Sequence, residues 1–208
     1  MAKLPAPPPP ERLAAIGADW RVVPKGTTLF RIYRRGGSHP ATWNAFRFYG
    51  PLNGRFDPHE LPRRQQDRGV LYAATHPGAA LAEFFQTRRT INVRHCQPWL
   101  VGLALARDVR LLDLTGLWPT RAGASMALAS GPRPRARAWA RAIYAAYPGA
   151  EGVWYGSSMH ANTPCVALFE RAQDALPPRP GYHRALSDET LRAFLDNVAA
   201  DLNFRLIV

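Results

Sequence analysis

Residues 69–85 have the sequence GVLYAATHPGAALAEFF, which contains the clearest strand-to-helix unit of the chain. The largely apolar run Gly69–Thr75 predicts a strand. Pro77 follows two residues later and suits the first position of a helix, where its missing N–H is not needed. We therefore expect a helix from Pro77 to about Arg89.

Further strands and helices are expected on both sides of this unit. Their apolar and β-branched content predicts strands at Thr27–Tyr33, Leu100–Ala106, Arg110–Leu114, Gly152–Ser158 and Cys165–Glu170. Helices are expected at Arg12–Ala18, Arg121–Ala129, Arg133–Tyr147 and over the amphipathic segment SDETLRAFLDNVAADL from Ser187, after which FRLIV adds an edge strand. Because helices separate the strands without regular βαβ alternation, the pattern favours an α+β fold over a doubly wound parallel sheet.

The length and composition predict a single-domain organisation. A chain of 208 residues with 47% apolar residues can build one hydrophobic core. We expect a Pro-rich tail and a short helix in residues 1–20, with residues 1–10 extended and mobile. The main domain is expected in residues 21–175, and a C-terminal helix and strand in residues 176–208 are expected to pack on it. The irregular segment Arg34–Arg68 is long for a simple connection, and such segments are often functional.

The charge of the chain implies an anionic partner. Lys and Arg total 27 against 15 for Asp and Glu, and most of the cations are arginine, whose planar fork of donors recognises phosphate. Nucleic acid, an acidic protein and the diphosphate of a dinucleotide all fit this charge. A high arginine and alanine content is equally compatible with a simple bias of genomic composition.

Several classes of site and location are disfavoured by the sequence. The two cysteines, Cys96 and Cys165, lack a CxxC or Cys/His cluster, and the histidines lack paired ligand spacing, so no metal site is expected. No window approaches the roughly 18 to 20 consecutive apolar residues of a membrane span. The Pro-rich start also lacks the apolar core of a signal peptide. We therefore expect a cytoplasmic protein without a membrane partner.

Four polar residues within apolar segments are candidates for chemistry. The Walker loop, the Rossmann glycine fingerprint, HExxH and GxSxG are all absent from the sequence. Arg31 interrupts LFRIY, Tyr72 interrupts VLYAA, Glu83 lies on the flank of an apolar helical stripe, and Ser157 follows VWYG. Each also has a simpler explanation, respectively a solvated arginine, a core tyrosine, a glutamate in water and a turn serine.

The order of four segments resembles a known family. LFRIY, NGRFDP, GVLYAATHPGAALAEFF and GVWYGSSMHANTPCVALFE follow one another as in the RES domain, which is named for its Arg, Glu and Ser. That domain is the toxin of RES–Xre toxin–antitoxin pairs. The resemblance runs from about Thr28 to Arg171 and implies an ADP-ribosyltransferase-like fold with mixed, mainly antiparallel sheets and flanking helices. It identifies Arg31, Glu83 and Ser157 as the family's Arg, Glu and Ser.

The same resemblance adds Tyr72 and Arg55 as neighbouring pocket residues. Relatives often have Gly-Gly-Arg-Trp where this chain has Asn53–Phe56. The doublet of Ser157 and Ser158 leaves the serine open by one position, and the family's spacing favours Ser157.

Membership of this family would imply NAD as the substrate. Relatives consume it by hydrolysis, by phosphorolysis or by ADP-ribose transfer to a protein. Positive charge develops on the ribose as nicotinamide leaves, and the Glu83 carboxylate can stabilise that charge. Arg31 and Arg55 would bind the diphosphate. Tyr72 would stack on nicotinamide or hydrogen-bond in the pocket, and Ser157 would hold a phosphate or the carboxamide. The implied partner is a cognate Xre-type antitoxin. Contact with nucleic acid would then occur only through that antitoxin.

Two other functions fit parts of the sequence. Arg133, Arg135, Arg137 and Arg141 lie on one expected helix and are typical of a nucleic-acid-binding protein or ribonuclease-type toxin, although soluble helices often expose such charge. A catalytically inactive RES-like module that binds NAD without consuming it is the third alternative.

Overall fold

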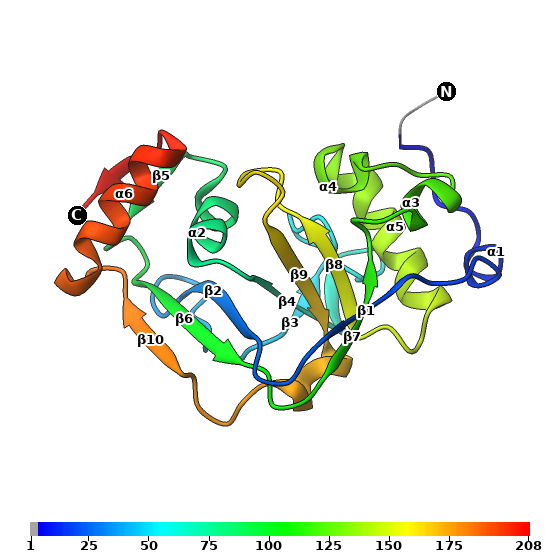
Figure 1. Ribbon diagram of the computed structural model, residues 1–208, viewed down its shortest axis with the longest axis horizontal. Helices are drawn as coiled ribbons and strands as arrows, with labels where there is room; N and C mark the ends of the chain where they lie inside the picture. The colour runs from blue at the N-terminus through cyan, green and yellow to red at the C-terminus, as the bar shows by residue number, and fades with distance from the viewer. Residues whose placement is uncertain (1–3) are drawn as a thin grey trace.

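The computed structural model describes residues 4–208 and consists of a twisted sheet with helices packed against it (Figure 1). The strands are β1 (Trp20–Val23), β2 (Thr28–Arg34), β3 (Arg47–Gly50), β4 (Arg64–Ala74), β5 (Thr90–Asn92), β6 (Pro98–Ala104), β7 (Val109–Asp113), β8 (Gly152–Gly156), β9 (Pro164–Phe169), β10 (Tyr182–Ala185) and β11 (Arg205–Ile207). The helices are α1 (Pro10–Ala14), α2 (Pro77–Phe85), α3 (Trp118–Arg121), α4 (Ala127–Ser130), α5 (Arg133–Ala146) and α6 (Arg192–Leu202), with 3₁₀ turns η1 (Glu170–Ala175) and η2 (Glu189–Leu191).

Within residues 4–208, nine strands form the main sheet in the order β1-β7-β8-β9-β4-β2-β6-β10, and β3 also pairs with β4. All pairings in this sheet are antiparallel except that of β7 with β8. The fold is therefore a single α+β domain with a mixed, mainly antiparallel sheet, as expected from the sequence.

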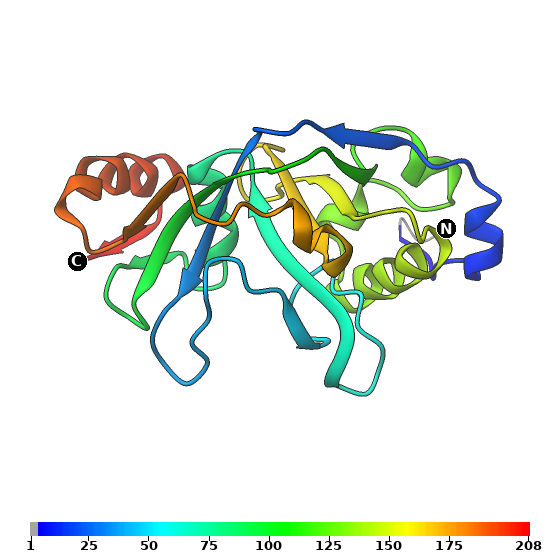
Figure 2. The same ribbon diagram turned by 90° about the horizontal axis from the view of Figure 1, so that it is seen from below.

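The sheet opens at its centre, between β2 and β4. In the described chain these two strands face each other in register only at Phe30 and Ala74. Beyond this pair they separate, so that β2, β6 and β10 form one wing of the sheet and β4, β9, β8, β7 and β1 form the other (Figures 1 and 2). Helix α2 lies beside the junction and contacts both β2 and β4.

Apolar side chains of alternate residues form a core on each face of the sheet. Along β4, Val70 and Ala74 belong to the core that contains α2 and α5, whereas Leu71 and Ala73 belong to the core on the other face. Successive side chains of a strand point to opposite faces, so a strand buried on both sides has a nearly continuous apolar sequence. This explains the run GVLYAA.

The central strand-to-helix unit is confirmed, with different ends. Strand β4 starts at Arg64, five residues before the expected Gly69, and α2 ends at Phe85 rather than at about Arg89. The remaining expected strands and the helix α5 are present, and each of their ends lies within two residues of the expected position.

The single helix expected at Arg121–Ala129 is wrong. The structure has two short helices there, α3 and α4. Gly123 between them adopts a φ of +83°, a left-handed conformation that an α-helix does not contain. The glycine therefore ends α3 and separates the two helices.

The expectation of a mobile tail is wrong from Leu4 onward. The Leu4 side chain is only 8% exposed, and the Trp139 indole N–H donates to the Pro5 carbonyl at 2.8 Å. Helix α1 begins at Pro10, two residues before the expected start. The apolar residues of this segment pack on α5, and residues 1–3 lie outside the described residues.

Short strands at the edges were missed by the sequence patterns. β1, β3, β5 and β10 have only three or four residues each, too few for a period to be recognised. The C-terminal edge strand was expected, and β11 pairs in parallel with β5 to form a separate two-stranded sheet. Its preceding helix starts as the turn η2 and continues as α6.

Candidate active site

A cavity of about 530 Å³ lies where the two wings of the sheet diverge. Its walls come from β2, β4, α2, the loop 52–55 and the region around the start of α5. Four of the five residues expected from the sequence line it, namely Arg31, Arg55, Tyr72 and Glu83. The fold thus brings side chains from four separate segments to one concave site, a common arrangement for binding sites.

Glu83 projects from the last turn of α2 and is held from both sides. Its Oε1 accepts a hydrogen bond of 2.6 Å from the Ser157 hydroxyl, and its Oε2 accepts one of 3.2 Å from Gln86 Nε2. The Ser157 Oγ also accepts from the Met159 backbone N–H at 3.1 Å. Ser157 is 1% exposed, whereas its neighbour Ser158 is exposed and lines the cavity. Ser157 therefore contacts the carboxylate rather than the cavity space.

Arg31 links β2 to the irregular segment that follows it. Its Nη1 donates to the carbonyls of Trp43 and Ala45, both at 3.0 Å. Burial lowers the pKa of the Arg31 guanidinium to about 10, so the side chain stays cationic at neutral pH. The cationic guanidinium of Arg31 therefore contributes a positive charge to the cavity wall.

Tyr72 and the buried Asp57 hold the loop that follows β3. The Tyr72 hydroxyl donates to Asp57 Oδ1 at 2.9 Å and accepts from the Phe56 backbone N–H at 2.9 Å. Asp57 is fully buried, and it also pairs with Arg47 Nη2 at 2.5 Å. Burial, followed by the charge of Asp57, raises the pKa of Tyr72 well above its usual value. The phenol thus stays protonated and donates to the carboxylate, while Tyr72 lines the cavity.

Gly54 allows this loop to pass close to the buried pair. A Cβ added at position 54 would collide with Asp57 Oδ1 and would lie 2.5 Å from the Tyr72 hydroxyl oxygen. The glycine of the sequence NGRF is therefore required by close approach, and it places Arg55 at the cavity. Arg55 Nη1 donates to the Gly131 carbonyl at the turn before α5.

Several polar cavity residues were missed as site candidates in the sequence, and two of them, Gln86 and Arg133, are linked to Glu83 by hydrogen bonds. Gln86 lines the cavity one turn after Glu83, and its Nε2 also donates to the Glu83 carbonyl at 2.7 Å. Arg133 lines the cavity from the first turn of α5 and donates to Gln86 Oε1 at 2.7 Å. The spacing of Gln86 from Glu83, three residues on one helix, was the available signal. Arg133 had no signal beyond its membership of an arginine-rich helix.

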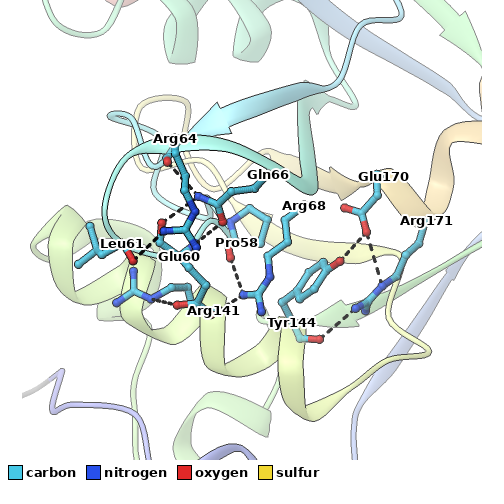
Figure 3. Close-up of polar contacts among 11 residues, drawn as sticks. Pro58, Glu60, Leu61, Arg64, Gln66, Arg68, Arg141, Tyr144, Glu170 and Arg171 are labelled. Atoms are coloured by element: carbon cyan, nitrogen blue, oxygen red, sulfur yellow. Dashed lines mark hydrogen bonds and ion pairs between the residues drawn. The ribbon is translucent and has the colours of Figure 1, made fainter.

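The arginines of α5 do not share one environment. Arg133 faces the cavity, whereas Arg135 is exposed. Arg141 Nε lies 3.7 Å from Glu60 Oε2, and Arg68 Nη1 lies 2.7 Å from Glu60 Oε1 (Figure 3). The set expected as a nucleic-acid patch is thus divided between a cavity, the open surface and an ion-pair network.

The network around Glu60 continues along α5 toward η1. The Arg171 Cζ lies 3.8 Å from the centre of the Tyr144 ring. The Tyr144 hydroxyl donates to Glu170 Oε1 at 2.6 Å (Figure 3). These contacts attach α5 to β4 and η1.

Residues 4–208 contain neither a grouping of metal ligands nor a membrane-spanning helix. Within that part of the chain no three His, Cys, Asp or Glu side chains are grouped so that they could hold a metal ion. None of its helices has the length and apolar character required to cross a membrane.

Comparisons with known proteins identify one family and one fold. The model of the RES domain matches residues 28–189. No curated protein matches the chain. A crystal structure described as the M. tuberculosis MbcT–MbcA toxin–antitoxin complex contains a chain with a similar fold, at a TM-score of 0.60 and 15% identity, covering 92% of this chain and 96% of that one.

Proposed function

Because this chain belongs to the RES domain family, we propose that it is a toxin that consumes NAD by cleaving the bond between nicotinamide and ribose. The observation that carries the proposal is the Glu83 carboxylate, fixed by Ser157 inside a cavity lined by arginines. A fixed anion beside cations suits a substrate that has an anionic diphosphate and develops a cationic sugar.

In the proposed reaction, Glu83 acts on the ribose from which nicotinamide departs. In the reaction, the bond from the ribose C1′ to the nicotinamide nitrogen breaks, and its electron pair leaves with the nicotinamide. Glu83 stabilises the positive charge that remains on the ribose. Water, phosphate or a protein side chain then donates an electron pair to C1′ and loses a proton. Because the departing ring is already cationic, its loss needs no strong acid.

The arginines and Tyr72 would bind the rest of the substrate. Arg31 and Arg55 provide charge at the wall for the diphosphate. The ring of Tyr72 offers a surface for the nicotinamide, while its hydroxyl holds Asp57 and the loop of Arg55. Ser157 is a positioning residue that orients Glu83.

The toxin role includes a protein partner. The structurally similar MbcT chain is described in a complex with the antitoxin MbcA. We propose that a cognate antitoxin of the Xre type neutralises this chain, and that nucleic acid is contacted only through that antitoxin. Expression of the chain alone should stop growth, and co-expression of the proposed antitoxin, expected as a small helix-turn-helix protein from the adjacent reading frame, should restore it.

The direct test of the activity uses the purified chain and NAD. Nicotinamide release is followed by chromatography in a buffer that contains EDTA, with and without phosphate and with an added cell extract as a source of protein acceptors. We expect release of nicotinamide, and the remaining product, ADP-ribose, its phosphorylated form or labelled protein, identifies the acceptor. Absence of nicotinamide release under all three conditions would contradict the proposal.

The two neighbouring serines provide a matched pair for the next prediction. Ser157→Ala removes the 2.6 Å hydrogen bond to Glu83. A hydrogen bond to a charged group contributes about 1.5–3 kcal/mol, so kcat should fall by roughly 10- to 100-fold. Ser158→Ala leaves that bond in place and should have a smaller effect. A larger loss in Ser158→Ala, measured by nicotinamide release, would show that the wrong serine had been chosen.

A further inference from the structure

Within residues 4–208, four of the five arginines that line the cavity have no carboxylate partner, and two of these four, Arg55 and Arg133, lie close enough for their charges to interact. Arg55 comes from the loop after β3 and Arg133 from the start of α5, and both line the cavity. Each donates to a neutral oxygen, Arg55 to the Gly131 carbonyl and Arg133 to the side-chain amide of Gln86. Among residues 4–208, neither guanidinium forms an ion pair with a carboxylate.

The other arginines that line the cavity differ from one another in their contacts. Arg47 pairs with the buried Asp57, and Arg31 is bound to two backbone carbonyls. Only Arg47 is thus neutralised. Arg31 keeps its charge, as does Arg63, which donates to the Pro51 carbonyl. Arg55 and Arg133 are the pair of unneutralised arginines whose charges act on each other. Burial and then the charge of Arg133 lower the pKa of Arg55, which indicates that the two like charges act on each other.

Two such guanidinium groups form a suitable site for a diphosphate. Like charges in a partly buried cavity repel each other, and an anion between them removes that repulsion. Arginine also offers a planar fork of donors that matches phosphate oxygens. The neutral oxygens of Gly131 and Gln86 orient the two groups without cancelling their charge.

Gln86 connects this pair of arginines to Glu83. An arginine can only donate and an ionised carboxylate can only accept, so Gln86 must turn its Oε1 to Arg133 and its Nε2 to Glu83. The observed contacts agree, with 2.7 Å to Arg133 and 3.2 Å to Glu83 Oε2. A single amide thus joins the cation to the carboxylate across two elements, α2 and α5.

We propose that Arg55 and Arg133 form a clamp for the diphosphate of NAD, and that Gln86 is a positioning residue that couples this clamp to Glu83. The proposal deepens the proposed function and rests on it for the identity of the substrate. In this arrangement the diphosphate lies between the two arginines, and the adjoining ribose meets Glu83. Binding of the anion would hold Arg133, Gln86 and Glu83 in their reactive arrangement.

Binding of inorganic pyrophosphate and of ADP to the purified wild-type chain tests the clamp without any turnover. By titration calorimetry, Arg133→Ala should weaken both ligands by about 10-fold or more, because it removes a charge-assisted contact. Arg135→Ala makes the same change of net charge on the same helix, at an exposed position, and should leave both affinities nearly unchanged. Equal losses in the two variants would overturn the clamp, since net charge alone would explain them.

The coupling through Gln86 is tested by a substitution of almost the same shape. Gln86→Glu places a carboxylate against Arg133, so pyrophosphate binding should fall at least as much as in Arg133→Ala. A role in folding alone would change the thermal unfolding temperature and leave the pyrophosphate affinity of the folded variant unchanged, and this result would overturn the coupling.

Cleavage kinetics then separate positioning from binding. Gln86→Ala should lower kcat for NAD more than it raises KM, and its effect on kcat/KM should not be additive with that of Arg133→Ala, as for residues in one network. Additive effects would contradict the coupling. If NAD is not cleaved but pyrophosphate binding still depends on Arg133, the proposed function fails and the clamp stands. If NAD is cleaved while pyrophosphate binding ignores Arg133, the clamp alone fails.

Discussion

Replacement of Glu83 by alanine is expected to reduce nicotinamide release by about 10²- to 10³-fold or more, and to abolish growth arrest. The reason is that Glu83 is the carboxylate of the cavity proposed to stabilise the positive charge on ribose, and loss of one such electrostatic contact typically has this effect. The effect should lie mainly in kcat, because the charge develops only as the bond breaks. Release of nicotinamide over a range of NAD concentrations gives both constants.

The neutral analogue Glu83→Gln sharpens this test. It keeps the size of the side chain and removes its charge, so it should be nearly as inactive as Glu83→Ala. Glu189→Gln makes the same chemical change at an exposed position in η2 and should retain full activity. If Glu83→Gln cleaved NAD at close to the normal rate, the proposed role of the carboxylate would be wrong.

Arg31→Met is expected to have the second largest effect, because it acts on both the cavity and the segment beside it. It removes a cation from the wall and leaves the Trp43 and Ala45 carbonyls without their donor. A hydrogen bond from a charged group contributes about 1.5–3 kcal/mol, so unfolding by urea should begin at a lower concentration. NAD cleavage should fall by roughly 10²-fold, with a clear rise in KM.

A comparison with lysine separates charge from geometry at this position. Arg31→Lys keeps the positive charge but has one compact ammonium in place of the planar fork. It should recover part of the affinity for NAD and little of the stability. Arg179→Met removes an exposed arginine and should change neither. Unchanged cleavage in Arg31→Met would remove Arg31 from the site.

The parts of the fold that were predicted from the sequence are those with strong local patterns. The unit of β4 and α2 has a long apolar run, a proline at the first helical position and an apolar stripe, and each of these acts within a few residues. The split between α3 and α4 depends on one glycine conformation, and the strand β3 on four residues within an irregular segment. Local patterns are too weak to specify such features.

The candidate site was likewise only partly predictable from the sequence. Arg31, Tyr72, Glu83 and Ser157 were recognised because polar residues stand out in apolar segments and because their order resembles the RES domain. That order could not show that Ser157 would contact Glu83 while Ser158 lined the cavity. Which of the two serines turns toward α2 is decided only when β8 and the loop after it pack beside that helix.

Residue types and their order along the chain were enough to establish the α+β class and the family resemblance, and to single out Glu83 as the candidate carboxylate. Contacts between distant residues needed the folded chain. Arg133 meets Gln86 across 47 positions, and the opening of the sheet beyond Phe30 and Ala74 creates the space they share. Such contacts depend on how whole elements pack against one another, and packing is a property of the three-dimensional arrangement that no short segment contains.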